Sequence, residues 1–221
     1  MRLLKLCGLI VLTIFLSLVV QIPIYLGINM FKGSVVLKIT ILLIAFLLLS
    51  GCLSLVKVKC FPNIPVKKYL SLRTTVGWTL LSFLLIIGIK SMLIGFGLYL
   101  ASANNDDIVQ QFNSPNMLVM LVALHFTGPI LEEVVFRGIF QESLMRLYPT
   151  QKYLPIFLSS FLFAYAHTYV LSANLLDYFI SGLLFSVLYC KQRQLRDSIF
   201  AHILTNSLIT VSSIIAGLLL K

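Results

Sequence analysis

The chain of 221 residues is 59% hydrophobic and only 11% charged, and its mean hydropathy is +1.02. A soluble domain carries about 25% charged residues, so this composition excludes an ordinary water-soluble globule. The formal charge is +10, but the Lys and Arg residues lie between apolar runs and form no single basic face. This distribution is typical of membrane orientation, so we expect a lipid bilayer as partner and no nucleic acid.

Seven apolar runs, each long enough to cross or nearly cross a bilayer, follow one another along the chain. The first is too long for a signal peptide and lacks a small-residue cleavage site, so we expect it to be retained. The predicted spans cover residues 3–28, 35–56, 74–100, 115–147, 153–171, 174–189 and 198–220. We therefore predict an all-α polytopic membrane bundle of about seven transmembrane helices, within a range of six to eight. It forms one membrane domain over residues 1–221.

The charges of the connecting loops predict the orientation of the bundle. With a cytoplasmic N-terminus, twelve of the 17 Lys and Arg residues fall on the inner side of the membrane. Of the other five, Lys32, Lys38 and Lys221 fall on the outer side, and Lys90 and Arg137 lie within spans. This bias follows the positive-inside rule and predicts a cytoplasmic N-terminus and an external C-terminus.

The fourth span contains two adjacent carboxylates and a guanidinium in the run GPILEEVVFRG, residues 128–138. Ionisable groups inside a membrane helix are costly and usually functional. Glu133 and Arg137, at i and i+4, share a helix face and can form an ion pair, which by itself could be purely structural. Glu132 is rotated about 100° away and has no counter-ion on its own helix, so it is the candidate general base.

Two other spans each carry a histidine with a partner one helical turn away. Phe163 and His167 are at i and i+4 on the fifth span, and His202 and Asn206 are at i and i+4 on the seventh. A single intramembrane histidine usually joins two helices by a hydrogen bond. Two histidines, an amide and a carboxylate pair on three helices instead indicate a site at which these helices converge.

In this order the motifs resemble those of the CPBP intramembrane proteases, which comprise CAAX-prenyl endopeptidases and bacterial relatives linked to bacteriocin processing and self-immunity. The motifs are Glu132-Glu133-x-x-x-Arg137, Phe163-x-x-x-His167 and His202-x-x-x-Asn206. The resemblance covers a catalytic core over residues 115–215, and the first three spans carry no family motif. The absence of soluble additions favours a bacterial relative, so we expect an integral, multi-pass protein of the bacterial plasma membrane.

The resemblance implies an intramembrane endopeptidase that hydrolyses membrane-associated proteins or peptides, in CAAX-type processing or in bacteriocin maturation and self-immunity. Glu132, assisted by His167, would activate a water molecule. His202 and Asn206 would donate hydrogen bonds to the oxyanion of the tetrahedral intermediate. No serine or cysteine nucleophile is required, since no GxSxG motif occurs.

Glu133, Arg137 and Phe163 would support this site, and no cofactor is expected. A zinc-dependent membrane protease is an alternative, because Glu and His from separate helices can bind zinc without an HExxH motif. A second alternative is a bacteriocin self-immunity protein that protects by binding, without proteolysis. A third is a small transporter with a Glu and His proton relay, although no repeat or discontinuous helix pair supports it.

Two expectations concern position. His125 lies seven residues before Glu132 on a similar helix face, and we interpret it as a packing histidine that could line a substrate cavity. His167 is about fifteen residues from Lys152, or roughly 20 Å along a helix, so the fifth helix has to start outside the hydrocarbon or tilt. We expect the site to open towards the cytoplasm, in the inner half of the bilayer.

Overall fold

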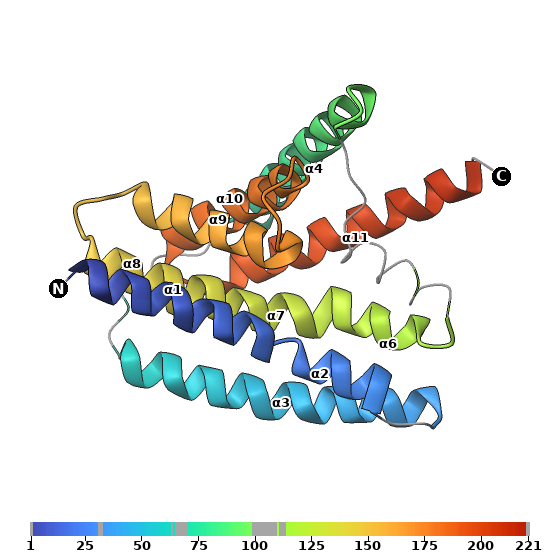
Figure 1. Ribbon diagram of the computed structural model, residues 1–221, viewed down its shortest axis with the longest axis horizontal. Helices are drawn as coiled ribbons and strands as arrows, with labels where there is room; N and C mark the ends of the chain where they lie inside the picture. The colour runs from blue at the N-terminus through green and yellow to red at the C-terminus, as the bar shows by residue number, and fades with distance from the viewer. Residues whose placement is uncertain are drawn as a thin grey trace.

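A computed structural model describes residues 2–30, 33–62, 64, 70–98, 110 and 114–219. Within these ranges the chain forms helices and no strand, which confirms the all-α prediction (Figure 1). The elements are α1 (Arg2–Val19), α2 (Ile22–Tyr25), η1 (Leu26–Met30), α3 (Val35–Cys60), α4 (Leu72–Gly95), α6 (Met117–Val122), η2 (Ala123–Thr127), α7 (Gly128–Glu133), η3 (Val134–Gln141), α8 (Glu142–Leu147), α9 (Leu154–Thr168), α10 (Leu175–Gln192) and α11 (Leu195–Leu219). The elements labelled η are π-helical turns.

Five helical segments of the described chain are long and apolar enough to cross a membrane. They are Arg2–Asn29, Val35–Cys60, Leu72–Gly95, Met117–Leu147 and Leu195–Ile215. Between the last two lie α9, which is apolar but only 15 residues long, and α10, which has 18 residues. Helices thus stand where the seven spans were predicted, and the chain is an integral, multi-pass membrane protein.

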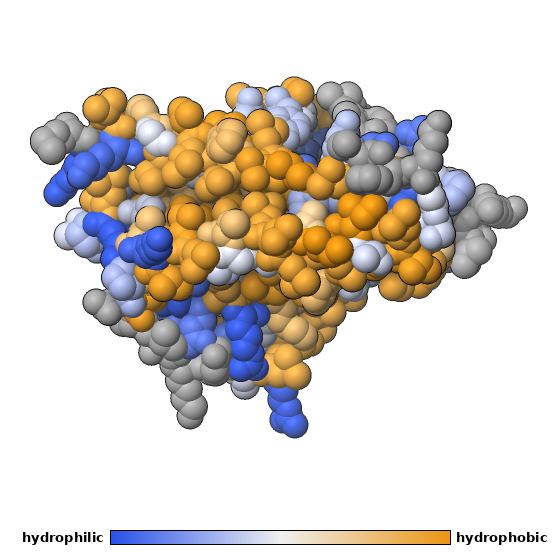
Figure 2. All heavy atoms as spheres, turned by 90° about the horizontal axis from the view of Figure 1, so that it is seen from below, coloured by the Kyte–Doolittle hydropathy of each residue, from blue (hydrophilic) through white to orange (hydrophobic). Residues whose placement is uncertain are grey.

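The outer surface of the bundle is apolar, as a surface in contact with lipid has to be. Large aliphatic side chains on the outer helices are mostly solvent-accessible, for example Leu4, Val36, Leu48 and Leu84. Figure 2 shows one such face, on which hydrophobic side chains cover the middle and hydrophilic ones gather mainly at the end where α1 begins. Backbone groups in lipid have no water to bond with, so helices are the form these runs adopt.

The fourth segment, α6 to α8, runs along the length of the molecule and forms its core (Figure 1). All eight residues of its π-helical part η3 are buried. This part packs against α1 and α3 on one side and against α9, α10 and α11 on the other. The helix that carries the charged motif is therefore enclosed by protein, where its charges can be paired.

A π-turn accommodates the proline of the motif. Proline removes a backbone donor and its ring clashes with the carbonyl four residues earlier, so a proline inside a helix usually kinks or breaks it. The structure instead widens the preceding turn: the Gly128 N–H bonds to the carbonyl of Ala123, five residues back, and α7 continues from there. A Cβ on residue 128 would lie 2.9 Å from that Ala123 oxygen, so glycine is required at this position.

The hairpin of α9 and α10 packs against η3, and its first helix, α9, is the shorter of the two. Directly after Thr168, Tyr169 adopts the left-handed conformation with φ of 53°, and its N–H caps the helix at the carbonyl of Tyr165. The two helices approach closely at Gly182, where a Cβ would lie 3.1 Å from the Ser160 backbone. Because α9 stops at Thr168, the hairpin covers only part of the length of α7 and α11.

One buried carboxylate ties helix ends together at the basic end of the bundle. Glu142 is fully buried and accepts hydrogen bonds from Arg193 Nε at 2.9 Å and from the Tyr189 hydroxyl at 3.0 Å. Its other oxygen pairs with Arg146 at 3.1 Å and with the Arg193 Nη2. Arg146 also lies over the ring of Phe61, at 4.9 Å, next to the end of α3. The basic ends of α3, α8 and α10 thus meet, as the loop charges predicted.

We expect Glu142→Gln to destabilise the bundle. The substitution removes the only negative charge shared by Arg146 and Arg193 in this cluster, and breaking a buried ion pair costs about 3–5 kcal/mol. Thermal denaturation of the purified protein in detergent should show a clear fall in the midpoint.

Arg146→Gln is the matched control, because 41% of the Arg146 side chain is exposed and exposed pairs contribute about 0–1 kcal/mol. Equal midpoints for the Glu142→Gln and Arg146→Gln proteins would contradict a stabilising role for the buried cluster.

Candidate active site

The structure brings Glu132, His167 and His202 together from three helices. Glu132 lies near the end of α7, His167 in the last turn of α9, and His202 in the second turn of α11. Glu132 Oε2 is 3.5 Å from His167 Nε2 and 3.8 Å from His202 Nε2. One carboxylate oxygen is therefore shared by the two motif histidines, which are 35 residues apart in the chain.

The protonation pattern of His167 follows from its second hydrogen bond. His167 Nδ1 is 2.7 Å from the carbonyl oxygen of Phe163. A carbonyl can only accept, so Nδ1 carries the proton and Nε2 of the neutral ring presents its lone pair towards Glu132. Two acceptors 3.5 Å apart are bridged well by a molecule that donates to both, and a water molecule has two such donors.

Glu133 pairs with two groups at once. Its Oε1 lies 3.0 Å from Arg137 Nη1 and 3.1 Å from His202 Nδ1. The side chains of Glu133 and Arg137 are 0% exposed, and that of His202 is 4% exposed. His202 thus bridges the two adjacent glutamates, with one ring nitrogen towards each.

Aromatic rings enclose the Arg137 guanidinium. The ring of Phe163 lies 4.5 Å from its Cζ and that of Phe185 lies 5.3 Å away, while Nη2 donates to the carbonyl of Gly182 at 3.2 Å. Phe185 stacks on His202 with ring centroids 4.5 Å apart. A carboxylate, a carbonyl and aromatic faces thus surround the guanidinium and offset its charge.

Exposure separates the two glutamates. The side chains of Glu132 and His167 are 12% and 18% exposed, whereas those of Glu133 and Arg137 are fully buried. Only the Glu132–His167 edge of the charged cluster can therefore meet a substrate or a water molecule. Glu133 and Arg137 are limited to holding their neighbours.

Asn206 lies one helical turn beyond His202 and has a different partner. Its Nδ2 donates to the carbonyl of Leu124 in η2, at 2.9 Å. The amide nitrogen carries two hydrogens, so one is left for a ligand. The Leu124 carbonyl lies two helical turns before Glu132, so Asn206 marks the edge of the site at which η2 faces α11.

Three residues of α10 that contribute to the site were not predicted. They are Tyr178, which stacks on His167 with centroids 4.8 Å apart, Gly182 and Phe185. They lie at i, i+4 and i+7 of one helix, so a shared face could have been read from the sequence. Nothing in the sequence shows that this face is the one turned towards the motif helices.

Metal binding is not indicated by the geometry alone. Among the residues that the structure describes, no group of three or more His, Cys, Asp or Glu side chains is arranged to hold a metal ion. All four cysteines are free thiols, and the cluster contains none of them. The zinc alternative stays a prediction and is tested by chelation below.

Comparison with known proteins gives two matches and no solved structure. The family model described as type II CAAX prenyl endopeptidase Rce1-like matches residues 114–208. A Bacillus subtilis (strain 168) protein named "Putative membrane peptidase YdiL" is 28% identical over 116 residues, which are 52% of this chain and 45% of that protein. No solved structure matches.

The family match falls on the part of the chain that carries the three motifs, and the chain covers less than half the length of the curated relative. The family model includes Glu132, Glu133, Arg137, Phe163, His167, His202 and Asn206 within its limits. The predicted resemblance to the CPBP proteases is therefore confirmed, and it rests on residues 114–208 of this membrane protein, which match the model of the type II CAAX prenyl endopeptidase Rce1-like family.

Proposed function

We propose that this protein is an intramembrane endopeptidase in which Glu132 and His167 activate water. The observation that carries the proposal is the Glu132–His167 contact of 3.5 Å, because this pair forms the accessible edge of a charged cluster that is otherwise sealed. Peptide hydrolysis needs a base beside a water molecule and donors beside the developing oxyanion. Glu132, His167, His202 and Asn206 supply both kinds of group.

In the proposed reaction, the water oxygen attacks the carbonyl carbon of the scissile peptide bond. One water proton passes to Glu132, and the lone pair of His167 Nε2 holds the other O–H in place. The tetrahedral intermediate then collapses, the C–N bond breaks, and the proton on Glu132 passes to the leaving amine. The products are a carboxylic acid and an amine, and no covalent enzyme intermediate forms.

The oxyanion receives hydrogen bonds from His202 and Asn206 in this scheme. His202 Nδ1 is engaged by Glu133 at 3.1 Å, so donation to the oxyanion uses Nε2 of the ring that carries both N–H groups. Asn206 donates through its second amide hydrogen. Donors fixed in a site without water are effective because they need no reorganisation during the reaction.

Glu133 and Arg137 hold the site rather than react. Their ion pair fixes the oxygen that orients His202, and the Gly182 carbonyl and the Phe163 ring fix Arg137 in turn. The backbone carbonyl of Phe163 also accepts a hydrogen bond from His167 Nδ1. The supporting residues therefore set the directions of both catalytic histidines.

The substrate class that we propose is a membrane-associated peptide or protein. The family description points to CAAX-type processing, and the relative is named as a membrane peptidase, both of which support peptide hydrolysis in general. Bacteriocin maturation or self-immunity is the biological role that we propose from the motifs. A library of fluorogenic peptides with apolar segments, presented in vesicles, identifies the cleaved sequence.

Glu132→Gln should abolish most of the cleavage while the protein still inserts and folds. The substitution keeps the size of the side chain and removes the base, and acid–base groups contribute about 10²–10⁴ in rate. Glu133→Gln should in addition lower accumulation, because it leaves Arg137 buried without a counter-charge, at a cost of about 3–5 kcal/mol. The measurements are the cleavage rate of the library peptide and the amount of folded protein.

Ser143→Ala is the control for these variants, since its hydroxyl bonds only to Ile139 within the same segment, at 2.7 Å. Unchanged cleavage by Glu132→Gln would mean that the motif is a structural ion-pair cluster. Loss of cleavage with an intact immunity phenotype would mean that the biological role is binding.

His202→Ala and Asn206→Ala should lower kcat far more than they change KM. Groups that act mainly on the oxyanion stabilise the transition state, and removal of one donor costs about 10²–10³ in kcat. Steady-state kinetics on the library peptide separate the two parameters. A rise in KM with kcat unchanged would assign these residues to substrate binding instead.

Activity should survive exhaustive treatment with a chelator and should not respond to added zinc, because the proposed water is activated by Glu132 and His167. The measurement is cleavage of the library peptide before and after dialysis against the chelator. Complete loss, restored by stoichiometric Zn²⁺, would establish the metalloprotease alternative.

A further inference from the structure

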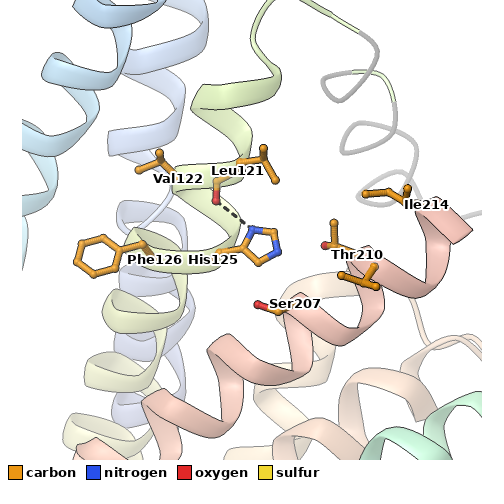
Figure 3. Close-up of a pocket in the computed structure, with 8 residues that line it drawn as sticks. Leu121, Val122, His125, Phe126, Ser207, Thr210 and Ile214 are labelled. Atoms are coloured by element: carbon orange, nitrogen blue, oxygen red, sulfur yellow. Dashed lines mark hydrogen bonds between the residues drawn. The ribbon is translucent and has the colours of Figure 1, made fainter.

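An open groove of about 600 Å³ lies between η2 and the second half of α11 (Figure 3). Its lining comes from α6, η2 and α11 and includes Leu121, His125, Ser207, Thr210 and Ile214. No residue of the α9–α10 hairpin lines it. This agrees with the early end of α9 at Thr168, which leaves this stretch of α11 uncovered by the hairpin.

The groove continues directly from the candidate site. His125 follows Leu124 in the chain and Ser207 follows Asn206, and the hydrogen bond between Asn206 and the Leu124 carbonyl is 2.9 Å long. This hydrogen bond therefore marks the inner end of the groove. A chain that lies in the groove and runs past it reaches the amide proposed for the oxyanion.

Polar groups face each other across the groove. His125 Nδ1 is 3.0 Å from the carbonyl of Leu121, so it carries the proton, and the other ring nitrogen is directed towards α11. Ser207 and Thr210 present hydroxyl groups from the opposite wall, while Leu121 and Ile214 border the groove with apolar surface (Figure 3). A lipid acyl chain cannot bond with the imidazole or the hydroxyls, whereas a peptide backbone can.

We propose that this groove binds the apolar segment of the substrate peptide next to the scissile bond, with a backbone N–H of that segment donating to His125 Nε2. The inference rests on the proposed function and adds the place of the substrate to it. The stretch from Ser207 to Ile214 is about 10 Å long at 1.5 Å per residue. It has room for about three extended residues at 3.3 Å each.

The position of the groove along the bundle also indicates which half of the bilayer it occupies. It lies on the opposite side of Glu132 from the basic end of the bundle, where Glu142, Arg146 and Arg193 meet. With the basic end in the cytoplasm, the bound segment lies in the outer half of the bilayer. This proposed position differs from the cytoplasmic opening that the sequence predicts for the site, and that opening stays a prediction.

Thr210→Trp tests the proposal by filling the groove, and Ile209→Trp is the matched control on the lipid-facing side of α11, where Ile209 is exposed. The probe is a fluorogenic peptide with a run of leucines next to its cleaved bond, in vesicles of phosphatidylethanolamine and phosphatidylglycerol. Thr210→Trp should raise KM about tenfold, the amount expected when one aliphatic side chain loses its contact, with kcat within about twofold. Ile209→Trp should match the parent protein. Equal KM values for the two variants would overturn the proposal.

A binding measurement tests the groove even if the Thr210→Trp protein fails to fold or the parent protein cleaves no peptide. Thr210→Cys and Ile209→Cys are made in a background whose native cysteines are replaced by alanine, and each is labelled with a benzophenone. Illumination with the biotinylated leucine peptide should cross-link it through position 210 and not through position 209. Cross-linking at 210 without any cleavage would refute the proposed function and keep the groove, whereas equal or absent cross-linking at 210 would refute the groove.

Discussion

A carboxylate buried in a membrane bundle has to be neutralised, and the neutralisation of Glu133 determines the arrangement of the whole site. Arg137, on the same helix, pairs with Glu133 Oε1 and offsets its charge. His202 contacts the same oxygen from α11. Arg137 is in turn held by α9 and α10 through the Phe163 ring and the Gly182 carbonyl. One oxygen atom thereby joins four helices at the depth of the charged cluster. Glu132, left without a guanidinium of its own, faces the two histidines.

The division between a sealed charge and an accessible charge is the physical basis of the different roles that we propose for the two adjacent glutamates. Glu133 is 0% exposed and contacts only buried neighbours, whereas Glu132 is 12% exposed beside His167, which is 18% exposed. A low-dielectric environment strengthens every interaction of the sealed pair and makes its loss costly. The accessible pair has the opposite requirement in the proposed reaction, in which water and substrate enter it.

The helices and the local pairs of the candidate site could be predicted from the sequence, whereas the other contacts of the site depend on how the helices pack against each other. The apolar runs predicted the helices, and the spacing of Glu133 and Arg137 predicted their pair, because both follow from local helix geometry. The bridging of both glutamates by His202 could not be predicted, since it depends on where α11 crosses α7. Likewise, Glu142 has a predictable partner in Arg146, four residues on, but its contact with Arg193 joins positions 51 residues apart. The π-turn at Ala123–Thr127 leaves no periodic signal, because it shifts the register by a single residue.

That single residue makes the segment tolerant of a deletion in an unusual way. A helix that loses one residue within η2 would recover ordinary i→i−4 bonding and stay continuous. The five-residue turn and the four-residue turn that replaces it each make one rotation, so the side chains before and after the deletion would keep their faces. The same deletion within the regular helix α6 would instead rotate the side chains on its two sides by about 100° relative to each other. The π-turn therefore holds one residue more than an α-helical turn without changing the direction of Glu132 relative to α6.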